Sequence, residues 1–290
     1  MSVWSALRSK LDSLTLVLVA VVALATVLPV RGEVAVALHH VTHVAIALLF
    51  FLHGAKLSTD AIWKGLTHWR LHGLIFATTF GLFPLAGLGL AWLGRGLLTP
   101  DLAAGFLFLC ILPATVQSAI AFASLARGNV AAAVCSASAS TLIGIVVTPL
   151  LAALILPSEQ AVAPSLTTVG RIALQIFLPF ALGQLARPWL GALLHRRAAI
   201  VKRVDQSSIL FVVYLAFSEA RTSGLWSRTS PTALALLVLF NAVLLALMLG
   251  TTTLLGRRLF AKDDEIALVF CGSKKSLASG VPMAQILFPA

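Results

Sequence analysis

The chain has 290 residues, of which 59% are hydrophobic and 11% are charged, and its formal net charge is +11. Soluble domains average roughly 45–50% apolar and about 25% charged residues, so this composition excludes a soluble globular protein. The basic residues occur in short clusters between apolar runs, as in the cytoplasmic loops of membrane proteins. We therefore expect the lipid bilayer as a partner, and no nucleic acid.

Apolar runs near 20 residues, long enough to cross about 30 Å of hydrocarbon, recur along the chain. The first of them has no small-residue cleavage pattern after it, so it is interpreted as a span and not as a cleavable signal. We predict an all-α polytopic membrane protein. Its nine predicted spans are 14–30, 35–54, 71–93, 101–126, 130–155, 166–186, 206–220, 231–255 and 266–288.

The basic residues are distributed unequally between the two ends of these spans. Fourteen lie on the side of the N-terminus, and four lie on the other side: Arg31, Arg95, Arg221 and Arg228. The positive-inside rule therefore predicts a cytoplasmic N-terminus for a protein of the cell membrane.

Histidines in the second predicted span have the spacing of metal ligands. They form the sequence HHVTH at 39–43, but no glutamate of an HExxH motif accompanies them, so we expect a structural or interfacial role. Cys110, Cys135 and Cys271 lie in apolar segments and match no metal motif, so they are expected to pack between helices. We find no phosphate loop and no nucleophile elbow, and we expect no enzyme, no catalytic residue and no metal site.

The fourth predicted span is interrupted near its centre. Pro113 removes a backbone N–H and clashes with the preceding turn, and the polar residues Thr115, Gln117 and Ser118 follow it. Irregular backbone at membrane depth is tolerated only where protein or a water-filled cavity satisfies it. These three polar residues are therefore candidates for binding a substrate or an ion.

The fifth predicted span contains a group of small hydroxyl residues. Ser136 and Ser140 share one helix face at four-residue spacing, and Ser138 lies between them. Small residues of this kind allow close packing of helices, and their hydroxyl groups can also serve a neighbouring broken helix. Both interpretations stay open, and the three serines are candidate binding residues.

The ninth predicted span has two adjacent lysines, Lys274 and Lys275, in the middle of an apolar segment. An ionised lysine at the centre of a spanning helix costs roughly 2.5–3.5 kcal/mol, so we do not expect both to face lipid. We expect them to face an aqueous cavity, where they meet an anion or control a cation site, together with Ser273 and Ser276. The alternative is that both lysines snorkel or pair structurally.

Two interrupted spans at equivalent positions indicate an internal repeat. If residues 1–156 hold spans one to five and residues 157–290 hold the later spans, the fourth and ninth spans correspond. An odd number of helices in each half inverts the second copy, as in transporters with inverted repeats. The chain stops one helix short of ten, so we expect the tenth helix to be missing. The candidate positions of the helix breaks are Pro113, Gly272, Gly280 and Pro282.

Four stretches together resemble the bile acid:sodium symporter superfamily, in particular its SBF-like branch related to sodium/bile acid cotransporter 7. They are THVAIALLFFLHGAKLS, PATVQSAIAFASLARGNVAAAVCSASAS, the apolar halves around these, and FCGSKKSLASGVPMAQILF. The resemblance covers essentially the whole chain. It implies two inverted five-helix repeats, a panel domain and a core domain, and fourth and ninth helices that are broken where they cross.

The resemblance also bears on the ion sites. Pro113 is kept, Gln117 and Ser118 occupy the region of the sodium ligands, and residues 273–276 replace the carboxylate and amide ligands of the ninth helix. An ammonium group at a sodium position implies transport that does not depend on sodium, although Na⁺ stays possible as a bound ion.

We therefore expect a secondary transporter that moves small organic anions by alternating access. Two alternatives stay open. One is a sodium-coupled symporter with displaced ligands, and the other is a regulatory membrane protein that modulates ion entry through protein partners.

Overall fold

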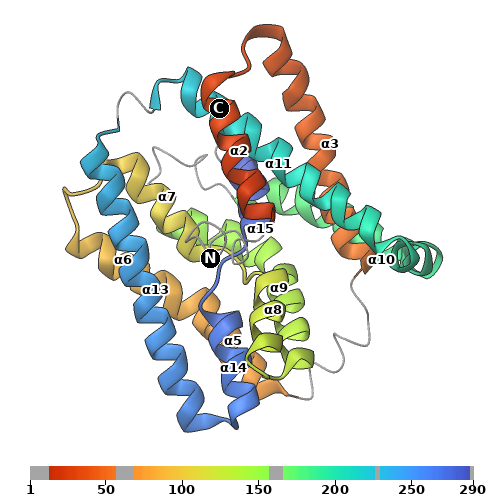
Figure 1. Cartoon of the computed structure of the whole chain (residues 1–290), viewed down its shortest axis with the longest axis vertical. Helices are drawn as coiled ribbons and strands as arrows, with labels where there is room; N and C mark the ends of the chain where they lie inside the picture. The colour runs from red at the N-terminus through yellow and green to blue at the C-terminus, as the bar shows by residue number, and fades with distance from the viewer. Residues whose placement is uncertain (1–12, 57–67, 157–165, 226–228, 288–290) are drawn as a thin grey trace, which may run out of the picture. The chain divides into compact units, whose positions relative to one another are not determined.

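The computed structural model describes residues 13–56, 68–156, 166–225 and 229–287, and all regular secondary structure in these residues is helical (Figure 1). The helices are α2 (Ser13–Val27), α3 (Gly32–Lys56), α5 (Trp69–Ala77), the π-helix η1 (Thr78–Leu82), α6 (Phe83–Leu93), α7 (Pro100–Ile111), α8 (Gln117–Leu125), α9 (Val130–Ile155), α10 (Leu166–Arg196), α11 (Ala198–Thr222), α13 (Pro231–Leu259), α14 (Lys262–Gly272) and α15 (Leu277–Leu287).

The described helices cover the segments predicted as membrane spans. Within the described residues, five helices are long and apolar enough to cross a membrane, and two further apolar helices are shorter. The five are Gly32–Ala55, Trp69–Leu93, Val130–Ile155, Ile176–Leu194 and Pro231–Leu259. The prediction of an all-helical, multi-pass membrane protein is confirmed. The predicted cytoplasmic start of the chain lies in residues 1–12, outside the described part.

Two helices are longer than predicted. The predicted sixth span ends at residue 186, whereas α10 continues to Arg196, and the predicted seventh span begins at residue 206, whereas α11 begins at Ala198. The added residues include Lys202 and Arg203, which are good helix formers but polar. A prediction based on apolar runs therefore ended before the helices did.

The chain divides into two compact units. Unit 1 contains α2, α3, the part of α10 from Leu178 onward, and α11. Unit 2 contains the beginning of α10 and the remaining helices, including the two interrupted ones. The boundary predicted between two sequence halves, at residues 156 and 157, borders the segment 157–165, which lies outside the described residues.

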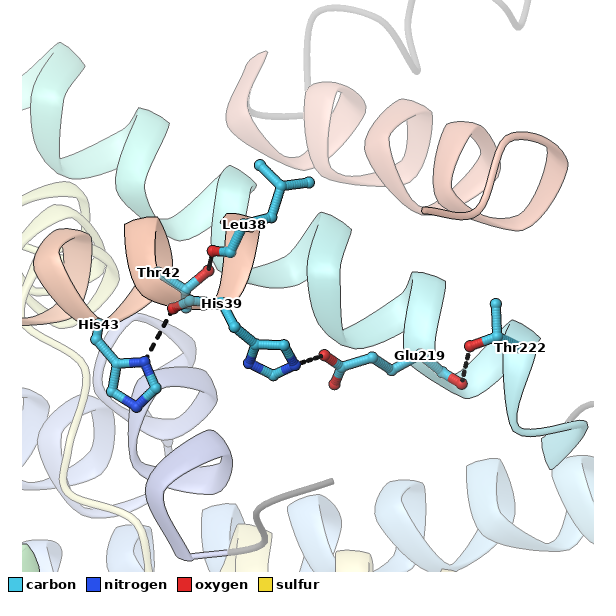
Figure 2. A network of polar contacts seen from close by, with 6 residues as sticks. All are labelled: Leu38, His39, Thr42, His43, Glu219 and Thr222. Atoms are coloured by element: carbon cyan, nitrogen blue, oxygen red, sulfur yellow. Dashed lines mark hydrogen bonds and ion pairs between the residues drawn. The ribbon is translucent and has the colours of Figure 1, made fainter. Parts of the chain in front are cut away.

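In unit 1, α11 packs against α2 and α3. The Tyr214 hydroxyl of α11 donates a hydrogen bond to the Leu28 carbonyl, with an oxygen–oxygen distance of 2.7 Å. His39 of α3 pairs with Glu219 of α11, and the His43 ring bonds to the His39 carbonyl (Figure 2). Figure 2 shows the His43 ring turned away from Glu219. Among the described residues, no three His, Cys, Asp or Glu side chains are grouped to hold a metal ion.

In unit 2, α5, α8, α9 and α14 pack around a core of small residues. Ala119, Ala123, Ala133, Ala137 and Ala267 are fully buried there. Because these side chains end at the β-carbon, the helix backbones approach closely, as is common in membrane helix packing. The close approach places the interrupted helices against α9 and against each other.

Candidate functional site

The first interruption separates α7 from α8. α7 ends at Ile111, and the residue before Pro113, Leu112, has an extended backbone with φ −67° and ψ 154°. Proline forces this conformation because its ring clashes with a helical residue in front of it. The helix resumes at Gln117, so residues 113–115 lie between the two helices, outside their hydrogen-bond pattern.

Hydroxyl groups of α9 satisfy part of this irregular backbone. The Thr148 hydroxyl donates to the Ile111 carbonyl at 2.9 Å, and the Ala114 N–H donates to the Ser140 hydroxyl at 3.0 Å. Thr148 and Ser140 are both fully buried. The buried carbonyl at the end of α7 and the buried N–H beyond it are thus both paired, which an apolar membrane interior requires.

The second interruption separates α14 from α15 and pairs with the first. Ala114 and Lys275 form an isolated antiparallel β-bridge, and the Ser276 N–H donates to the Pro113 carbonyl at 2.9 Å. The Ser276 hydroxyl accepts from the Ser279 N–H at 3.2 Å and so caps the start of α15. The two non-helical segments therefore satisfy each other's backbone groups where they meet.

The ammonium of Lys275 lies between two backbone carbonyls. Its Nζ donates to the Thr79 carbonyl at 2.7 Å and to the Leu112 carbonyl at 2.8 Å. It also lies 4.2 Å from the centre of the Phe83 ring. Thr79 belongs to η1, the π-helical turn inside the span Trp69–Leu93, and such turns are frequent at functional sites. The ammonium thus joins the end of α7, η1 and the second interruption.

Lys274 takes a different direction. Its Nζ lies 4.1 Å from the centre of the Phe122 ring of α8 and 5.7 Å from that of Phe270. The two rings are stacked on each other at 5.4 Å. Among the described residues, no acidic side chain forms an ion pair with either Lys274 or Lys275. The positive charges are therefore balanced by carbonyl dipoles and aromatic rings alone within this part of the chain.

Other predicted site residues form hydrogen bonds that do not involve the Lys275 ammonium. The Ser136 hydroxyl shares a hydrogen bond of 2.6 Å with Nδ1 of the buried His72. The Ser273 hydroxyl, directly after α14, donates back to the Val269 carbonyl of that helix. The Ser118 hydroxyl donates to the Thr115 hydroxyl at 3.3 Å.

Two further predicted positions lie on α9 and at the start of α8. Ser138 is half-buried on α9. The side chain of Gln117 lies outside the described residues, although its backbone begins α8. The structure thus brings Ser140, Lys275 and Ser276 together at the interruptions, and it directs Lys274 to α8.

Of the three positions predicted to break the ninth span around the lysines, one lies at the interruption and two do not. Gly280 and Pro282 lie inside α15, and Gly272 is the last residue of α14, so the second interruption is confined to residues 273–276. Gly272 and Gly280 do not have positive φ angles. A β-carbon at Gly272 would lie 2.7 Å from the Thr78 hydroxyl, and one at Gly280 would overlap the Leu112 side chain. At both positions glycine allows a neighbouring side chain to pack closely, and neither glycine uses the backbone freedom of a positive φ.

Sequence reasoning missed Thr79, His72 and Thr148. For Thr148 a signal is present, because Ser136, Ser140, Gly144 and Thr148 recur at intervals of four on α9. A β-carbon at Gly144 would lie 2.7 Å from the β-carbon of Pro113, so Ser140, Gly144 and Thr148 face the first interruption, whereas Ser136 bonds to His72. The Thr79 carbonyl has no such signal, since any residue supplies a carbonyl.

Residues 12–290 of the chain match the SBF-like CPA transporter family. YfeH of Escherichia coli (strain K12), named as a candidate symporter, is 53% identical over 280 residues, which cover 96% of this chain and 84% of YfeH. Protein PA2026 of Pseudomonas aeruginosa is 56% identical over 278 residues, with the same coverage of 96% and 84%. Sodium/bile acid cotransporter 7 of Mus musculus is 29% identical over 267 residues, which cover 90% of this chain and 76% of the cotransporter.

The similarity extends over nearly the whole chain and includes both interruptions. It confirms the resemblance predicted from the sequence, and together with the apolar helices it identifies a multi-pass membrane transporter. The chain belongs to the SBF-like CPA transporter family.

Proposed function

We propose that this transporter moves small organic anions by alternating access, with the ammonium of Lys275 in the place of a coupling cation. The observation that carries the proposal is the position of Nζ, 2.7 Å and 2.8 Å from two backbone carbonyl oxygens. Rings of carbonyl oxygens are also what replaces the hydration shell of an alkali cation in membrane proteins. A lysine in such a position serves as a cation that the chain itself supplies.

The charge of the site supports an anionic substrate. Lys274 and Lys275 have no carboxylate partner among the described residues, so the interrupted helices retain an excess of positive charge. Lys274 is half-buried, and the Phe122 ring beneath its ammonium is 41% exposed. We assign the anion contact to Lys274, with Ser138, Thr115 and Ser118 as further candidates, and the cation position to Lys275.

The division into units supports the inverted repeat on which alternating access depends. The sequence predicts two halves, 1–156 and 157–290. The first two spans of each half belong to unit 1, and the later spans belong to unit 2. The exception is the beginning of α10, which belongs to unit 2. Each half also contributes one interrupted helix. Unit 1 corresponds to the expected panel domain and unit 2 to the expected core domain, in a protein of the cell membrane with a cytoplasmic N-terminus.

A sodium-coupled symporter is the second candidate. The relatives named sodium/bile acid cotransporter 7 favour it, because that name specifies both a coupling ion and a substrate. In this chain Thr115 and Ser118 offer hydroxyl oxygens beside the first interruption. The two candidates differ in one measurable property, the dependence of transport on Na⁺.

The test is transport by purified protein in liposomes, with a radiolabelled bile acid, benzoate and succinate as probes. We expect uptake of at least one anion at equal rates in sodium and in N-methylglucamine buffers. Lys274→Gln should raise KM for that anion, and Lys275→Gln should make uptake depend on added Na⁺. Uptake by the unchanged protein only in sodium establishes the second candidate, and folded protein that neither binds nor moves any of the anions overturns both.

A further inference from the structure

A groove lies on unit 2 between the beginning of α5 and the end of α13. It has a volume of about 360 Å³ and is lined mainly by apolar side chains. Trp69 and Leu259 stand at its edges and are 71% and 56% exposed. Among the described lining residues Arg70 alone has a guanidinium group, and Gly73 contributes no side chain to the lining.

The groove lies at the level where two candidate spans end. The span Trp69–Leu93 begins with the groove, and the span Pro231–Leu259 ends there. Tryptophan is enriched at this level in membrane proteins, because its ring is apolar and its N–H is polar. The groove therefore opens where lipid headgroups meet acyl chains.

The charges around the groove leave Arg70 available to a ligand. Two of the three acidic groups at the start of α14 are engaged elsewhere, since Glu265 pairs with Arg257 and Lys262, and Asp264 accepts a hydrogen bond from Asn129. Arg70 is exposed, and within the described residues it forms no ion pair. A guanidinium in an apolar groove favours a ligand whose anionic end accepts a forked pair of hydrogen bonds.

We propose that this groove binds an anionic phospholipid, with the phosphate on Arg70 and an acyl chain over Gly73. Such a lipid combines the two properties that the groove selects, a phosphate at the headgroup level and an apolar chain below it. The positive-inside pattern of the sequence places the groove on the cytoplasmic side, where basic pockets between helices bind anionic headgroups. The same helical run carries Thr79, which holds Lys275, so the lipid contacts an element of the transport site.

The steric test uses a glycine that the fold does not need. A β-carbon at Gly73 meets no atom within 4 Å, so a side chain can start there without a clash, and the leucine of Gly73→Leu extends into the groove. Gly89→Leu is the matched control, because Gly89 lies on the same helical run, also has open space within 4 Å, and is not part of the groove. Arg70→Gln tests the charge, with the exposed Arg95→Gln as its control.

The measurement is native mass spectrometry of detergent-purified protein titrated with phosphatidylglycerol, phosphatidylcholine or inorganic phosphate, with melting curves to verify folding. One basic residue at the membrane surface contributes about 1 kcal/mol, which is about a 5-fold change in affinity. We therefore expect a preference of about 5-fold or more for phosphatidylglycerol, which Arg70→Gln abolishes. Gly73→Leu should weaken phosphatidylglycerol binding by at least about 5-fold, and both controls should bind as the unchanged protein does.

Three results overturn the lipid site. In the first, the unchanged protein binds the two lipids equally. In the second, Gly73→Leu and Gly89→Leu retain phosphatidylglycerol equally. In the third, inorganic phosphate stabilises the protein as much as phosphatidylglycerol does. The last result identifies a free-anion site. None of these measurements uses transport, so they stand or fall independently of the proposed substrate.

Discussion

Lys274 and Lys275 are neighbours in the chain but hold their charges in different ways. The Lys275 ammonium pairs with the carbonyls of Thr79 and Leu112, two residues that are buried. The Lys274 ammonium rests on aromatic rings, and the ring beneath it is 41% exposed. Loss of the first charge therefore leaves buried acceptors unpaired, whereas loss of the second leaves a ring that tolerates an apolar neighbour.

This difference predicts unequal effects of the same substitution. Lys275→Met should lower the free energy of unfolding by about 1–3 kcal/mol for each carbonyl left unpaired. Lys274→Met removes only a cation–π contact, which is worth about 0.5–1 kcal/mol at an exposed site. Thermal denaturation in detergent measures both. A melting temperature that falls equally in the two variants contradicts the separate roles.

The buried pair of His72 and Ser136 leads to a second prediction. Ser136→Ala should destabilise the fold by about 1–3 kcal/mol, because one nitrogen of a buried imidazole loses its hydrogen bond. Ser138→Ala, on the same helix but half-buried, is the matched control and should unfold as the unchanged protein does. If the two variants melt together, the bond between Ser136 and His72 does not stabilise the native state.

The sequence identified several of these residues as site candidates, but it did not predict the contacts that each of them makes. Lysines in an apolar segment are conspicuous, because their cost in lipid is high. The two lysine side chains point in separate directions because the backbone at 273–276 is not helical. Without a helical period, the sequence does not indicate how neighbouring side chains are oriented. The carbonyl of Thr79 was unpredictable for another reason, since its role comes from a π-helical turn and not from its side chain.

Among the helices, α9 serves as the support for the first interruption. Ser140 and Thr148 bond to backbone groups of the segment around Pro113, and Gly144 lets α9 approach the proline ring. The four-residue interval keeps these positions on one helix face. The hydroxyl pattern could be predicted from the sequence, whereas the partner across the interface, Pro113, became evident only from the packing.

This packing predicts the cost of a single methyl group. In Gly144→Ala the new β-carbon would lie 2.7 Å from the rigid proline ring, so the helix must shift, and overpacking of this kind costs about 1–3 kcal/mol. Gly105→Ala in α7 is the control, because a β-carbon there meets nothing within 4 Å. The control should be neutral or slightly stabilising, as alanine favours helices over glycine by about 1 kcal/mol. Equal melting temperatures would show that α9 does not press on Pro113.

At the scale of the whole molecule, apolar runs were sufficient to predict the helices but not their grouping into units. Hydrophobicity reports burial in lipid and in protein alike, so it does not say which helices pack together. The division of α10 at Leu178 illustrates this, because the helix is continuous in sequence and structure while its two parts belong to different units. The inverted repeat likewise stays a prediction, supported by the membership of the units.

The predicted orientation can be tested with single cysteines. The three native cysteines are all buried, so a membrane-impermeant maleimide should report on introduced ones. We expect Arg258→Cys to react only from the cytoplasmic side and Arg95→Cys only from the outside, since both positions are exposed and lie at opposite ends of predicted spans. Labelling of both from one side contradicts the assigned topology.

The ammonium of Lys275 belongs to the chain, so the cell cannot deplete it, exchange it or store energy in its gradient. A carrier of monovalent anions built around it moves one negative charge per cycle, with no sodium ion to compensate. One elementary charge gains about 2.3 kcal/mol across 100 mV, which corresponds to about a 50-fold accumulation ratio. The inside-negative potential of a cell membrane then drives such anions outward. If the proposed function holds, the chain works as an exporter powered by membrane voltage, and proteoliposomes with an imposed potassium diffusion potential should show the direction of net flux.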